Sequence, residues 1–239
     1  MKQIEQLQYI LDHAKNIVFF TGAGVSTDSG IPDFRSTDGL YNQEYDYPPE
    51  EIISHSFFLK NPKEFYRFYK NKMIYEDAQP SITHEFIAKC EAKGISSGVI
   101  TQNIDGLHTK AGSKHVIELH GSFLRNHCMK CGKFHPLSSI TSSKGIPVCS
   151  CKGIIKPDVV LYEEALRNQD LEQAVQMIIK ADVMIVLGTS LMVYPAAGLI
   201  RYFRGSHLII INKSTTQYDQ QADICNNAPL KEVLSQIRI

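Results

Sequence analysis

A buried strand that runs directly into a Gly-x-Gly turn constrains this chain most. The apolar run over residues 16–21 (NIVFFT) is typical of a parallel strand buried on both faces. Gly22 and Gly24 follow it at once. Glycines here permit a tight turn and let the backbone approach a pyrophosphate, whose charge is favoured near a following helix N-terminus. The sequence therefore predicts a dinucleotide site at the start of an α/β sheet.

The residues after this turn depart from the pattern of hydride-transferring dehydrogenases. That pattern has a third glycine where this chain has Thr27, and a second strand that ends in an acidic residue about 20 positions later. The segment in question, LYNQEYDYPP over residues 40–49, has two prolines and many polar residues, so a central strand is not expected. In its place stands IPDFR at residues 31–35, a loop with an acid, an aromatic ring and a base. A hydride-transferring dehydrogenase is therefore disfavoured.

Chain length and charge further limit the domain organisation and the kinds of binding partner that are expected. The 239 residues suffice for one sizeable core, or for a core with a smaller appended unit. Basic and acidic residues number 25 each, so bulk charge indicates neither a nucleic-acid nor a membrane partner. Residues 1–16 lack the pattern of a signal peptide, and no apolar run reaches spanning length. We expect a cytoplasmic protein, monomeric, without nucleic-acid or membrane partners.

Apolar periodicity predicts alternating strands and helices. Further strands are expected over residues 98–101, 116–119, 183–187 and 208–211, and helices over residues 3–14, 62–75, 81–92, 166–180, 195–203 and 229–237. This alternation predicts a Rossmann-like, doubly wound parallel sheet with ligands over the carboxyl ends of its strands. Two segments interrupt it, and we expect them to build a small domain with a helical part at 36–79 and a zinc-binding part at 121–156. The sheet domain would comprise residues 1–35, 80–120 and 157–239.

Four of the six cysteines are arranged as two close pairs. Cys128 and Cys131 form a Cys-x2-Cys pair, and Cys149 and Cys151 form a Cys-x-Cys pair after 17 intervening residues. Without a secretory signal, a metal site is a better interpretation than disulfides. Four thiolates suit tetrahedral zinc, and the spacing resembles a zinc ribbon with no open position for catalysis. The alternative is a set of four buried free thiols.

Polar residues follow several predicted strands at their carboxyl ends. The run QNID at residues 102–105 follows one strand, and His120 follows the next. Thr189 and Ser190 follow a third strand, and Asn212 follows a fourth. A histidine can act as a general base near neutral pH, and hydroxyl and amide groups can bond ribose and adenine. The structural alternatives are a capped loop, a histidine without a chemical role and ordinary strand-end capping.

Taken together, these motifs resemble those of the sirtuins, the NAD-dependent protein-lysine deacylases. The resemblance covers nearly the whole chain in order and rests on GAGVSTDSGIPDFRS, TQNIDGLH, ELHGS, the four cysteines, PDVVLY, GTSLMVYPA and the IN pair. It implies a Rossmann-like large domain, a small zinc-plus-helical domain, one structural zinc ion, and NAD and acyl-lysine entering the cleft from opposite sides.

The resemblance also implies roles for individual residues. Phe34 would cover the nicotinamide end of NAD, Asp105 would bond its carboxamide, and Asn103 would bond the ribose or a fixed water. Substrate backbone would pair as an added strand with Val159, Val160 and Leu161. All residues implied to contact NAD are Ala23, Thr27, Phe34, Arg35, Gln102, Ile104, Asp105, His120, Thr189, Ser190, Asn212 and Ile224.

The reaction implied by the resemblance consumes NAD. The acyl oxygen attacks the ribose C1′ as nicotinamide leaves, and an alkylimidate forms. His120 then takes a proton from the ribose hydroxyls, so that the 2′ oxygen attacks the imidate carbon. The products are nicotinamide, free lysine and 2′-O-acetyl-ADP-ribose. A protein mono-ADP-ribosyltransferase on the same scaffold and a non-enzymatic NAD sensor are alternatives, against which the set Asn103, Asp105 and His120 argues.

Two features depart from the family pattern. One is the short Cys-x-Cys pair. The other is Glu163, which stands where the family usually has glycine, a residue that allows close backbone approach to a peptide. We expect Glu163 to alter peptide preference or local geometry.

The positions of the arginines predict which acyl groups the protein removes. Sirtuins that prefer succinyl or malonyl groups share a Tyr-x-x-Arg pair, whose arginine meets the distal carboxylate in a bidentate way. None of the seven arginines of this chain lies three residues after a tyrosine. The sequence therefore predicts neutral acyl groups as substrates, acetyl first.

Overall fold

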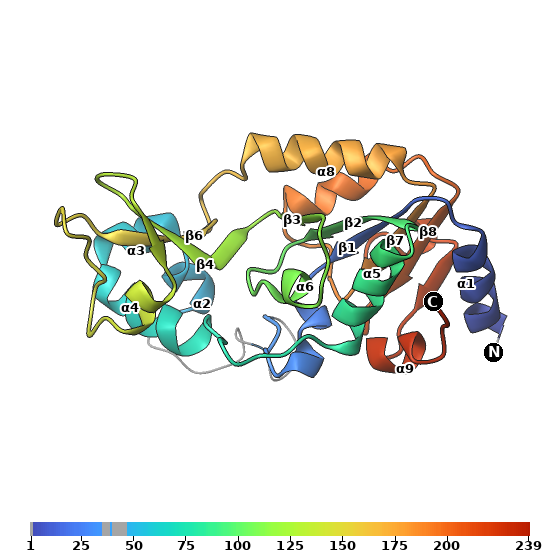
Figure 1. The fold of residues 1–239 in the computed structure, drawn as a ribbon, viewed down its shortest axis with the longest axis horizontal. Coiled ribbons are helices and arrows are strands. Elements are labelled where there is room, and N and C mark those ends of the chain that lie inside the picture. Colours follow the sequence, from blue (N-terminus) through green and yellow to red (C-terminus); the bar gives the residue numbers. More distant parts are fainter. Residues whose placement is uncertain (1, 35–38, 40–46) are drawn as a thin grey trace.

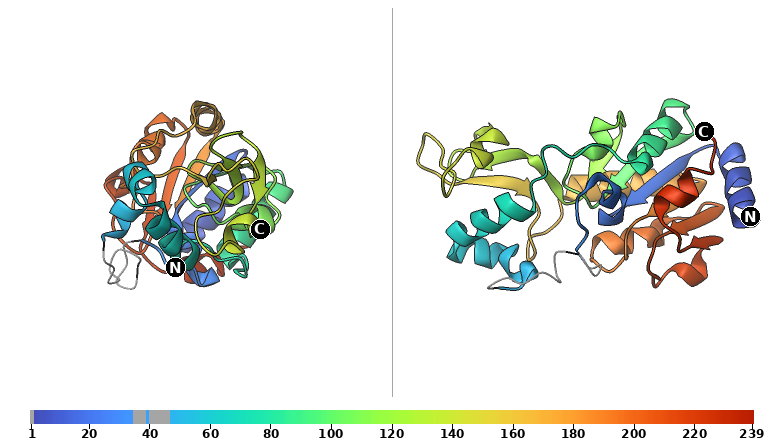
Figure 2. Two further views of the ribbon diagram at one scale, coloured as in Figure 1. Left: turned by 90° about the vertical axis from the view of Figure 1, so that its left-hand side faces the viewer. Right: turned by 90° about the horizontal axis from the view of Figure 1, so that it is seen from below.

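The computed structural model describes residues 2–34, 39 and 47–239 and has two lobes along one long axis (Figure 1). The larger lobe is built on a six-stranded sheet and the smaller on a three-stranded sheet with short helices. Both termini lie at the end of the larger lobe that is remote from the smaller one (Figure 1). The right-hand view in Figure 2 shows the same separation of the lobes. The chain therefore enters and leaves the smaller lobe from the larger one.

The six-stranded sheet is parallel throughout and has the order β3-β2-β1-β7-β8-β9. Its central strand β1 pairs on one side with β2, the next strand in the chain, and on the other side with β7, from the C-terminal part of the chain. A ligand crevice is expected at such a switch point, outside the carboxyl ends of the strands. The strand bounds are β1 Ile17–Thr21, β2 Ser96–Thr101, β3 Val116–Glu118, β7 Val183–Leu187, β8 His207–Ile211 and β9 Ile224–Asn226.

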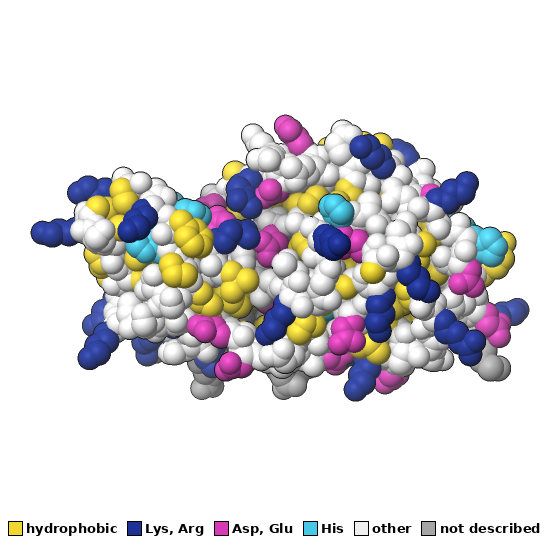
Figure 3. Space-filling view, viewed as in Figure 1, with side chains coloured by type: hydrophobic (Ala, Val, Ile, Leu, Met, Phe, Trp, Pro, Cys, Tyr) yellow, Lys and Arg dark blue, Asp and Glu magenta, His cyan; other side chains and the backbone are white. Residues whose placement is uncertain are grey.

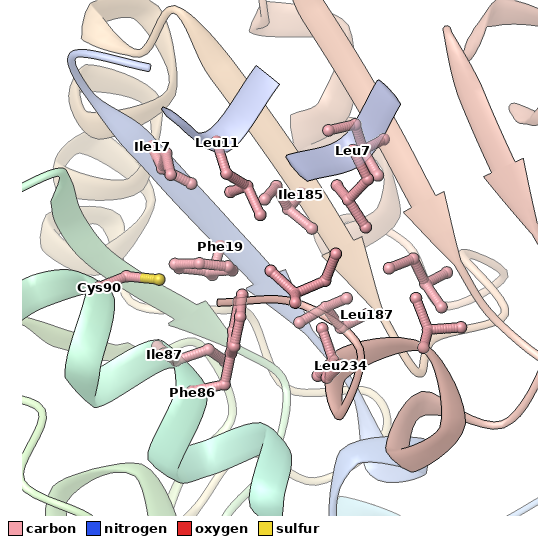
Figure 4. Close-up of a cluster of buried hydrophobic side chains, with 14 of the residues drawn as sticks. Leu7, Leu11, Ile17, Phe19, Phe86, Ile87, Cys90, Ile185, Leu187 and Leu234 are labelled. Atoms are coloured by element: carbon pink, nitrogen blue, oxygen red, sulfur yellow. The ribbon is translucent and has the colours of Figure 1, made fainter. Parts of the chain in front are cut away.

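Helices cover both faces of this sheet. On one face α1 (Lys2–His13), α5 (Ile82–Ala92) and α9 (Leu230–Leu234) pack against the strands, and Figure 4 shows side chains of these helices, Leu7, Phe86 and Leu234 among them, in one cluster with Phe19 and Ile185 of the sheet. On the other face α8 (Asn168–Lys180) and the 3-10 helix η4 (Ala196–Tyr202) complete a second core. All five residues of β1 and of β7 are buried, which explains their unbroken apolar runs.

Several predicted helices differ from those observed. The Gly-x-Gly turn leads into two short 3-10 turns, η1 (Ala23–Val25) and η2 (Thr27–Ser29), instead of a helix, and Gly30 ends them with φ at +82°. The segment predicted as a helix at 195–203 is the 3-10 helix η4, and α9 is shorter than predicted. The other predicted helices and all five predicted strands are confirmed within three residues at each end. None of the helices in the described part of the chain has the length and apolarity needed to cross a membrane.

The smaller lobe combines both segments that interrupt the alternation. Its antiparallel sheet has the order β5-β4-β6, and aromatic rings from two helices, among them Phe58, Phe65 and Tyr66, pack edge to face beneath it. Because Phe123 and Ile155 of the sheet belong to the same core, the helical and cysteine-bearing segments form one structural unit. The residue boundaries predicted for the two domains stay a prediction. The element bounds are α2 Pro49–Ile52, α3 His55–Lys60, α4 Pro62–Lys72, α6 Leu107–Lys110, β4 Gly121–Cys128, β5 Phe134–Pro136, α7 Ser138–Thr141 and β6 Ile155–Val159.

Candidate active site and metal centre

The turn after β1 is packed directly against the turn after β7. The Gly24 N–H donates a hydrogen bond of 2.8 Å to the Gly188 carbonyl oxygen. A Cβ atom at Gly24 would lie 2.8 Å from the Gly188 Cα, and one at Gly22 would lie 2.7 Å from the Thr189 Cβ. Thr27 stands where the dehydrogenase pattern has its third glycine, and its hydroxyl closes the turn by donating to the Gly24 carbonyl at 3.0 Å. Glycine at positions 22 and 24 is therefore required by the close approach of two strand ends.

A side-chain hydrogen bond joins the ends of two strands across β1. Gln102, after β2, donates from Nε2 to the Thr189 hydroxyl oxygen at 2.9 Å, and the Leu191 N–H donates to the same oxygen at 3.2 Å. The hydroxyl proton of Thr189 remains available for another acceptor. These contacts hold two of the predicted NAD-binding side chains in fixed positions at the carboxyl edge of the sheet.

His120 follows β3 at the same edge, and one hydrogen bond fixes its ring. Its Nδ1 lies 2.9 Å from the Gln102 carbonyl oxygen, which only accepts, so Nδ1 carries the proton and Nε2 holds the lone pair. Burial lowers the pKa of His120 below 6.5, although the bond to Gln102 acts in the opposite direction. The ring is therefore neutral at pH 7, with Nε2 able to accept a proton.

Ser26 joins Asn103 and Asp105 in a second network. The Ser26 hydroxyl donates to Asp105 Oδ2 at 2.6 Å, and it accepts from Asn103 Nδ2 at 3.0 Å. The other carboxylate oxygen, Oδ1, accepts from the Leu107 N–H at 2.9 Å. Two donors thus bind the Asp105 carboxylate, and its further lone pairs are left as acceptors.

Two buried histidines lie behind this network, and the sequence analysis did not identify them. His84 Nδ1 accepts from the Ser81 N–H at 3.0 Å, so Nε2 carries the proton and faces the Ser26 hydroxyl oxygen at 3.5 Å. His108 Nε2 lies 3.0 Å from the Thr21 hydroxyl, and the two histidine rings are 4.7 Å apart. Burial lowers the pKa of His84 to about 4, although Asp105 opposes the shift. Burial, and then the neighbouring His84, lower the pKa of His108 well below 6.5.

The tautomer of His84 sets the direction of the hydrogen bonds that link it through Ser26 to Asp105. Because the Ser81 main chain fixes the His84 tautomer, the Ser26 oxygen accepts a hydrogen bond from His84 Nε2–H and donates its own hydroxyl hydrogen to Asp105. The sequence signal that could have found His84 is the spacing Ser81-x-x-His84, a capping box at the start of α5.

The remaining residues predicted to bind NAD are only partly brought together. Ala23, Thr27 and Ser190 are half-buried at the strand edge, and Asn212 lies at the end of β8 with its amide donating to the Ser214 carbonyl at 2.7 Å. Phe34 and Ile104 pack against the core of the smaller lobe, so they lie between the lobes. Ile224 is different: its side chain is buried in the core of the larger lobe. Arg35 lies outside the described residues.

The predicted peptide-binding segment joins the lobes. Val159 and Leu161 point into the core of the smaller lobe, whereas Val160 is only half-buried and its N–H donates to the His120 carbonyl at 2.9 Å. On the other side, the Tyr162 N–H donates to the Ile53 carbonyl at 3.1 Å. The segment is thus anchored within hydrogen-bonding distance of His120.

Glu163 and Glu164 hold the end of this segment against α3. Glu163 has φ at +74°, which explains why glycine is usual here, and its carboxylate accepts from the Ser56 N–H and hydroxyl, each at 2.9 Å. Glu164 accepts from His55 at 2.7 Å and from Lys156 at 3.1 Å. Burial opposes ionisation of Glu164, but the Leu161 N–H, His55 and Lys156 lower its pKa below the usual value. The glutamate at position 163 therefore occupies a glycine-type backbone conformation and is held by the start of a helix.

The four paired cysteines come together at the far end of β4 and β6. Their sulfur atoms all lie within 4.8 Å of one another, with Cys128 and Cys151 3.4 Å apart and Cys131 and Cys149 3.8 Å apart. A tetrahedral ion with Zn–S distances of about 2.3 Å separates its sulfurs by roughly 3.8 Å. The short Cys-x-Cys pair therefore fits a zinc ion, and all four ligand positions are filled by protein.

Comparisons with known proteins agree with this geometry. A model of the Sir2 family matches residues 22–195. A Clostridium perfringens (strain 13 / Type A) protein named NAD-dependent protein deacetylase is 52% identical over 239 residues, covering 98% of both chains. A Staphylococcus aureus (strain N315) protein of the same name is 45% identical over 223 residues, covering 92% of both.

Solved structures give the same result. One of Sir2 with a deacetylated p53 peptide and 3'-O-acetyl ADP-ribose has a TM-score of 0.90 at 37% identity, covering 98% of this chain and 96% of that one. Another, of Sir2 with a p53 peptide and NAD+, has a TM-score of 0.85 at 38% identity with the same coverage.

Proposed function

This chain belongs to the Sir2 family, and on that premise we propose how the residues of its cleft carry out NAD-dependent deacetylation of protein lysine. The protein is an NAD-dependent protein deacetylase with NAD as co-substrate and a four-cysteine zinc site. The acetyl group passes to ADP-ribose, one water molecule is consumed, and nicotinamide and free lysine are released. The observation that carries the residue assignments is the neutral, fixed His120 ring beside the network of Asn103 and Asp105.

We assign proton removal to His120. Its Nδ1–H donates to the Gln102 carbonyl, so the ring cannot rotate without losing that bond, and Nε2 is the basic atom. A lowered pKa keeps this nitrogen unprotonated at neutral pH, which suits a general base acting on a ribose hydroxyl. After the proton transfer, the same Gln102 carbonyl stabilises the imidazolium.

Asp105 and Asn103 would act on the nicotinamide half of NAD. The Asp105 carboxylate keeps acceptor capacity for the carboxamide N–H groups, because Ser26 and Leu107 supply its other bonds. Asn103 donates one amide hydrogen to Ser26, and its remaining polar atoms would orient the ribose or a water. Phe34, packed against the smaller lobe, would exclude water from the reacting carbon.

The remaining proposed contacts are those with the ribose and adenine of NAD and those with the acetyl-lysine peptide. Gln102, Thr189, Ser190 and Asn212 stand at strand ends and would hold the ribose and adenine. Ile224 would contact NAD only through its main chain, since its side chain is in the core. Acetyl-lysine peptide would lie along Val159, Val160 and Leu161, which brings the acyl group to the His120 side of the cleft.

The zinc ion has a structural part in this proposal. Cys128, Cys131, Cys149 and Cys151 would hold it, and the ion would supply the rigidity of the β4–β6 end of the smaller lobe. Through β6 this rigidity extends to the segment that binds peptide. A mono-ADP-ribosyltransferase is not favoured, because the relatives named above are deacetylases.

A mass-spectrometric assay tests the function. The purified protein is incubated with NAD and an acetyl-lysine peptide, and acetyl-ADP-ribose, nicotinamide and free peptide are expected in equal amounts. His120→Ala should lower product formation by about 10²-fold or more, whereas His207→Ala, at a half-exposed histidine before the apolar part of β8, should leave it near the wild-type level. ADP-ribose attached to protein, without acetyl-ADP-ribose, would instead support the transferase.

We also infer that the protein acts as a cytoplasmic monomer without nucleic-acid or membrane partners. The balanced charge of the chain supports this. Light scattering coupled to size exclusion should give a mass near 26.9 kDa.

A further inference from the structure

The outer face of the β5-β4-β6 sheet exposes apolar side chains that the deacetylase site does not use. His127 lies opposite Phe134 on β5 and Lys156 on β6, and Met129, the residue after the end of β4, continues the alternation of His127. The Met129 N–H donates to the Ile154 carbonyl at 2.9 Å, and Ile154 pairs in turn with Val148. We define the outer sheet face by His127, Met129, Phe134, Val148, Ile154 and Lys156.

Strand alternation shows that this face points to solvent. Asn126, Cys128 and Ile155 alternate with its members and are buried beneath the sheet. Met129, Phe134 and Val148 are instead 50%, 54% and 56% exposed. Three large apolar side chains exposed together, with polar residues around them, are typical of an interaction site.

Charge around the end of the face near the cysteines is basic, whereas at the other end of the small sheet Lys156 is paired with Glu164 and Arg125 with Asp158. No acidic residue occurs between Glu118 and Asp158, although this stretch holds six of the 25 Lys and Arg residues. The rest of the chain therefore carries 19 basic and 25 acidic residues, so its neutral total conceals an uneven distribution. Even with four thiolates on Zn²⁺, which together bring two negative charges, the stretch has a net charge of about +4.

Three exposed lysines of this stretch lie close in the chain to members of the outer sheet face, and none of them forms an ion pair within the described residues: Lys130, Lys133 and Lys152. Lys130 lies against Gly153, whose neighbours are Lys152 and Ile154. Figure 3 shows the tip of the smaller lobe with Lys and Arg side chains and no Asp or Glu side chain on the face in view. The apolar face thus has a basic rim.

We propose that the outer sheet face binds an acidic polypeptide segment that also carries apolar side chains, and that this segment belongs to the protein whose acetyl-lysine enters the cleft. The basic rim would meet its carboxylates, and Met129, Phe134 and Val148 would bury its apolar groups. The rings of His127 and Phe134 contact each other edge to face, and the rest of the exposed apolar centre, Met129 and Val148, offers no flat ring on which a nucleic-acid base could stack. The exposed apolar centre therefore favours a polypeptide over a nucleic acid.

The sheet also connects the face with the cleft, and this part of the proposal rests on the proposed function. β4 begins directly after His120, and its eight residues at about 3.3 Å each span roughly 25 Å at most. β6 likewise leads from Ile154 to the segment at Val160. A substrate held at both places would gain affinity through its high effective concentration, without any change at the reacting atoms.

Matched peptides test the proposal. One acetyl-lysine peptide is made without a tail, with an acidic-apolar tail, and with the same tail carrying Asn and Gln for Asp and Glu. A flexible Gly-Ser spacer of about 20 residues has an average span of roughly 25 Å, and it is attached at either end of the peptide. For the wild type we expect the acidic tail to lower KM on the order of tenfold with kcat unchanged, and the gain to shrink from about 50 to about 300 mM salt.

Variants locate the effect. The double variant Lys130→Glu, Lys133→Glu should abolish the gain, and Phe134→Ser should reduce it, while kcat/KM for the untailed peptide stays unchanged. The matched control is Lys93→Glu, Lys231→Glu, which reverses two exposed lysines of the larger lobe and should keep the gain. Zinc content near one per chain verifies that each variant retains the cysteine cluster.

Three outcomes would overturn the proposal. One is equal KM for the acidic and neutral tails on the wild type. Another is loss of the gain in the control variant as well, which would mean long-range attraction and no local site. The third is competition by single-stranded DNA together with no effect of Phe134→Ser, which would identify a polyanion site. If the untailed peptide is not deacetylated at all, the proposed function fails, and tail binding is then measured separately by fluorescence anisotropy of the labelled tail.

Discussion

The two sheets of this protein are stabilised in different ways. The six-stranded sheet is covered on both faces, and its central strands β1 and β7 are fully buried. The three-stranded sheet has a core on one face only, and one of its strands, β5, has three residues. Apolar burial, worth about 1.5–3 kcal/mol for each large side chain, suffices for the first sheet. The second sheet has few such side chains at its cysteine end, where a metal ion must supply the cohesion.

The same difference extends to the cleft. Residues of the larger lobe reach it through short, closed hydrogen-bond networks, such as the one that joins His84, Ser26 and Asp105. The smaller lobe contributes through a few main-chain bonds, of which the one from Val160 to His120 is central. Chemistry should therefore depend on single side chains of the larger lobe, and peptide binding on the intact small sheet.

The largest effect is expected at His120. His120→Ala removes the base, and general-base contributions are on the order of 10²–10⁴-fold, so deacetylation should fall by that range or more while the fold survives. Because the His120 pKa is lowered, the basic form persists in acid, and the acidic limb of kcat/KM should have its midpoint below pH 6.5. Steady-state rates across pH measure both. Near-normal turnover of the variant would refute the assignment.

Removal of the metal should destabilise the three-stranded sheet and leave the six-stranded sheet unaffected. Cys128→Ala or a chelator should release zinc, and amides of β4–β6 should then exchange hydrogen quickly, whereas β1 and β7 keep their protection. The lost stabilisation is of the order of several kcal/mol and local to the smaller lobe. Hydrogen exchange read by mass spectrometry, with Cys90→Ala as a control in the larger core, distinguishes the regions. Purified protein without zinc, or equal loosening of both sheets, would contradict this account.

The choice of acyl group tests whether a basic side chain lies in the channel that holds the acyl group of the substrate. With no Tyr-x-x-Arg pair, a succinyl carboxylate would enter without a counter-charge, which is costly in a dry site. We expect kcat/KM for acetyl peptide to exceed that for the matched succinyl peptide by on the order of tenfold or more, since each 1.4 kcal/mol is a factor of ten. An equal or higher succinyl value would mean that a base from residues 41–72 reaches the channel.

A smaller effect concerns the pH dependence of stability in the larger lobe. The unfolded pKa of His84 is near 6.5 and the folded pKa is about 4, so the unfolded chain binds more protons between these values. Stability from this site is fully present above pH 6.5 and is lost as pH falls towards about 4. The loss is roughly 2 kcal/mol by pH 5, at 1.36 kcal/mol per pH unit.

Replacing His84 makes this effect measurable. His84→Asn should be less stable at pH 7, but its free energy of unfolding should fall less between pH 7 and pH 5 than that of the wild type. Denaturant titrations of both proteins at several pH values give the difference, in which the contribution of the zinc site cancels. Parallel curves for the two proteins would exclude His84 as the titrating group.

The smallest effect is expected at Glu163. Glu163→Gly relieves a left-handed backbone conformation but loses two hydrogen bonds to Ser56, which are solvent-exposed and so weak. The two changes nearly cancel, and the free energy of unfolding should shift by less than about 1 kcal/mol. Glu163→Val should cost more, because a β-branched residue tolerates this conformation poorly. A large destabilisation by glycine would mean that the contact with α3 dominates.

Much of the larger lobe was predictable from local patterns. The bounds of β7 are those predicted, and β1 differs by one residue, because strands buried on both faces carry unbroken apolar runs. The strands β4, β5 and β6 were missed, since their residues alternate with polar and cysteine positions whose burial depends on α3 and α4. The Gly-x-Gly turn is not followed by the helix that such phosphate sites usually have, because packing against Gly188 and the turn at Gly30 limit that segment to 3-10 geometry.

By itself the sequence determined the parallel sheet, the strand-end positions of His120 and Asp105, and the two cysteine pairs, because each depends on residues close together in the chain. Only the tertiary structure decided that His84 orients Ser26, from 58 positions away, and that Ser26 reaches Asp105 across 79. It also decided that Ile224 points into the core and that an apolar, basic face lies beyond the cysteines. Hydrogen bonds between distant segments and the exposure of a sheet face follow from how the lobes pack, and local patterns do not encode that packing.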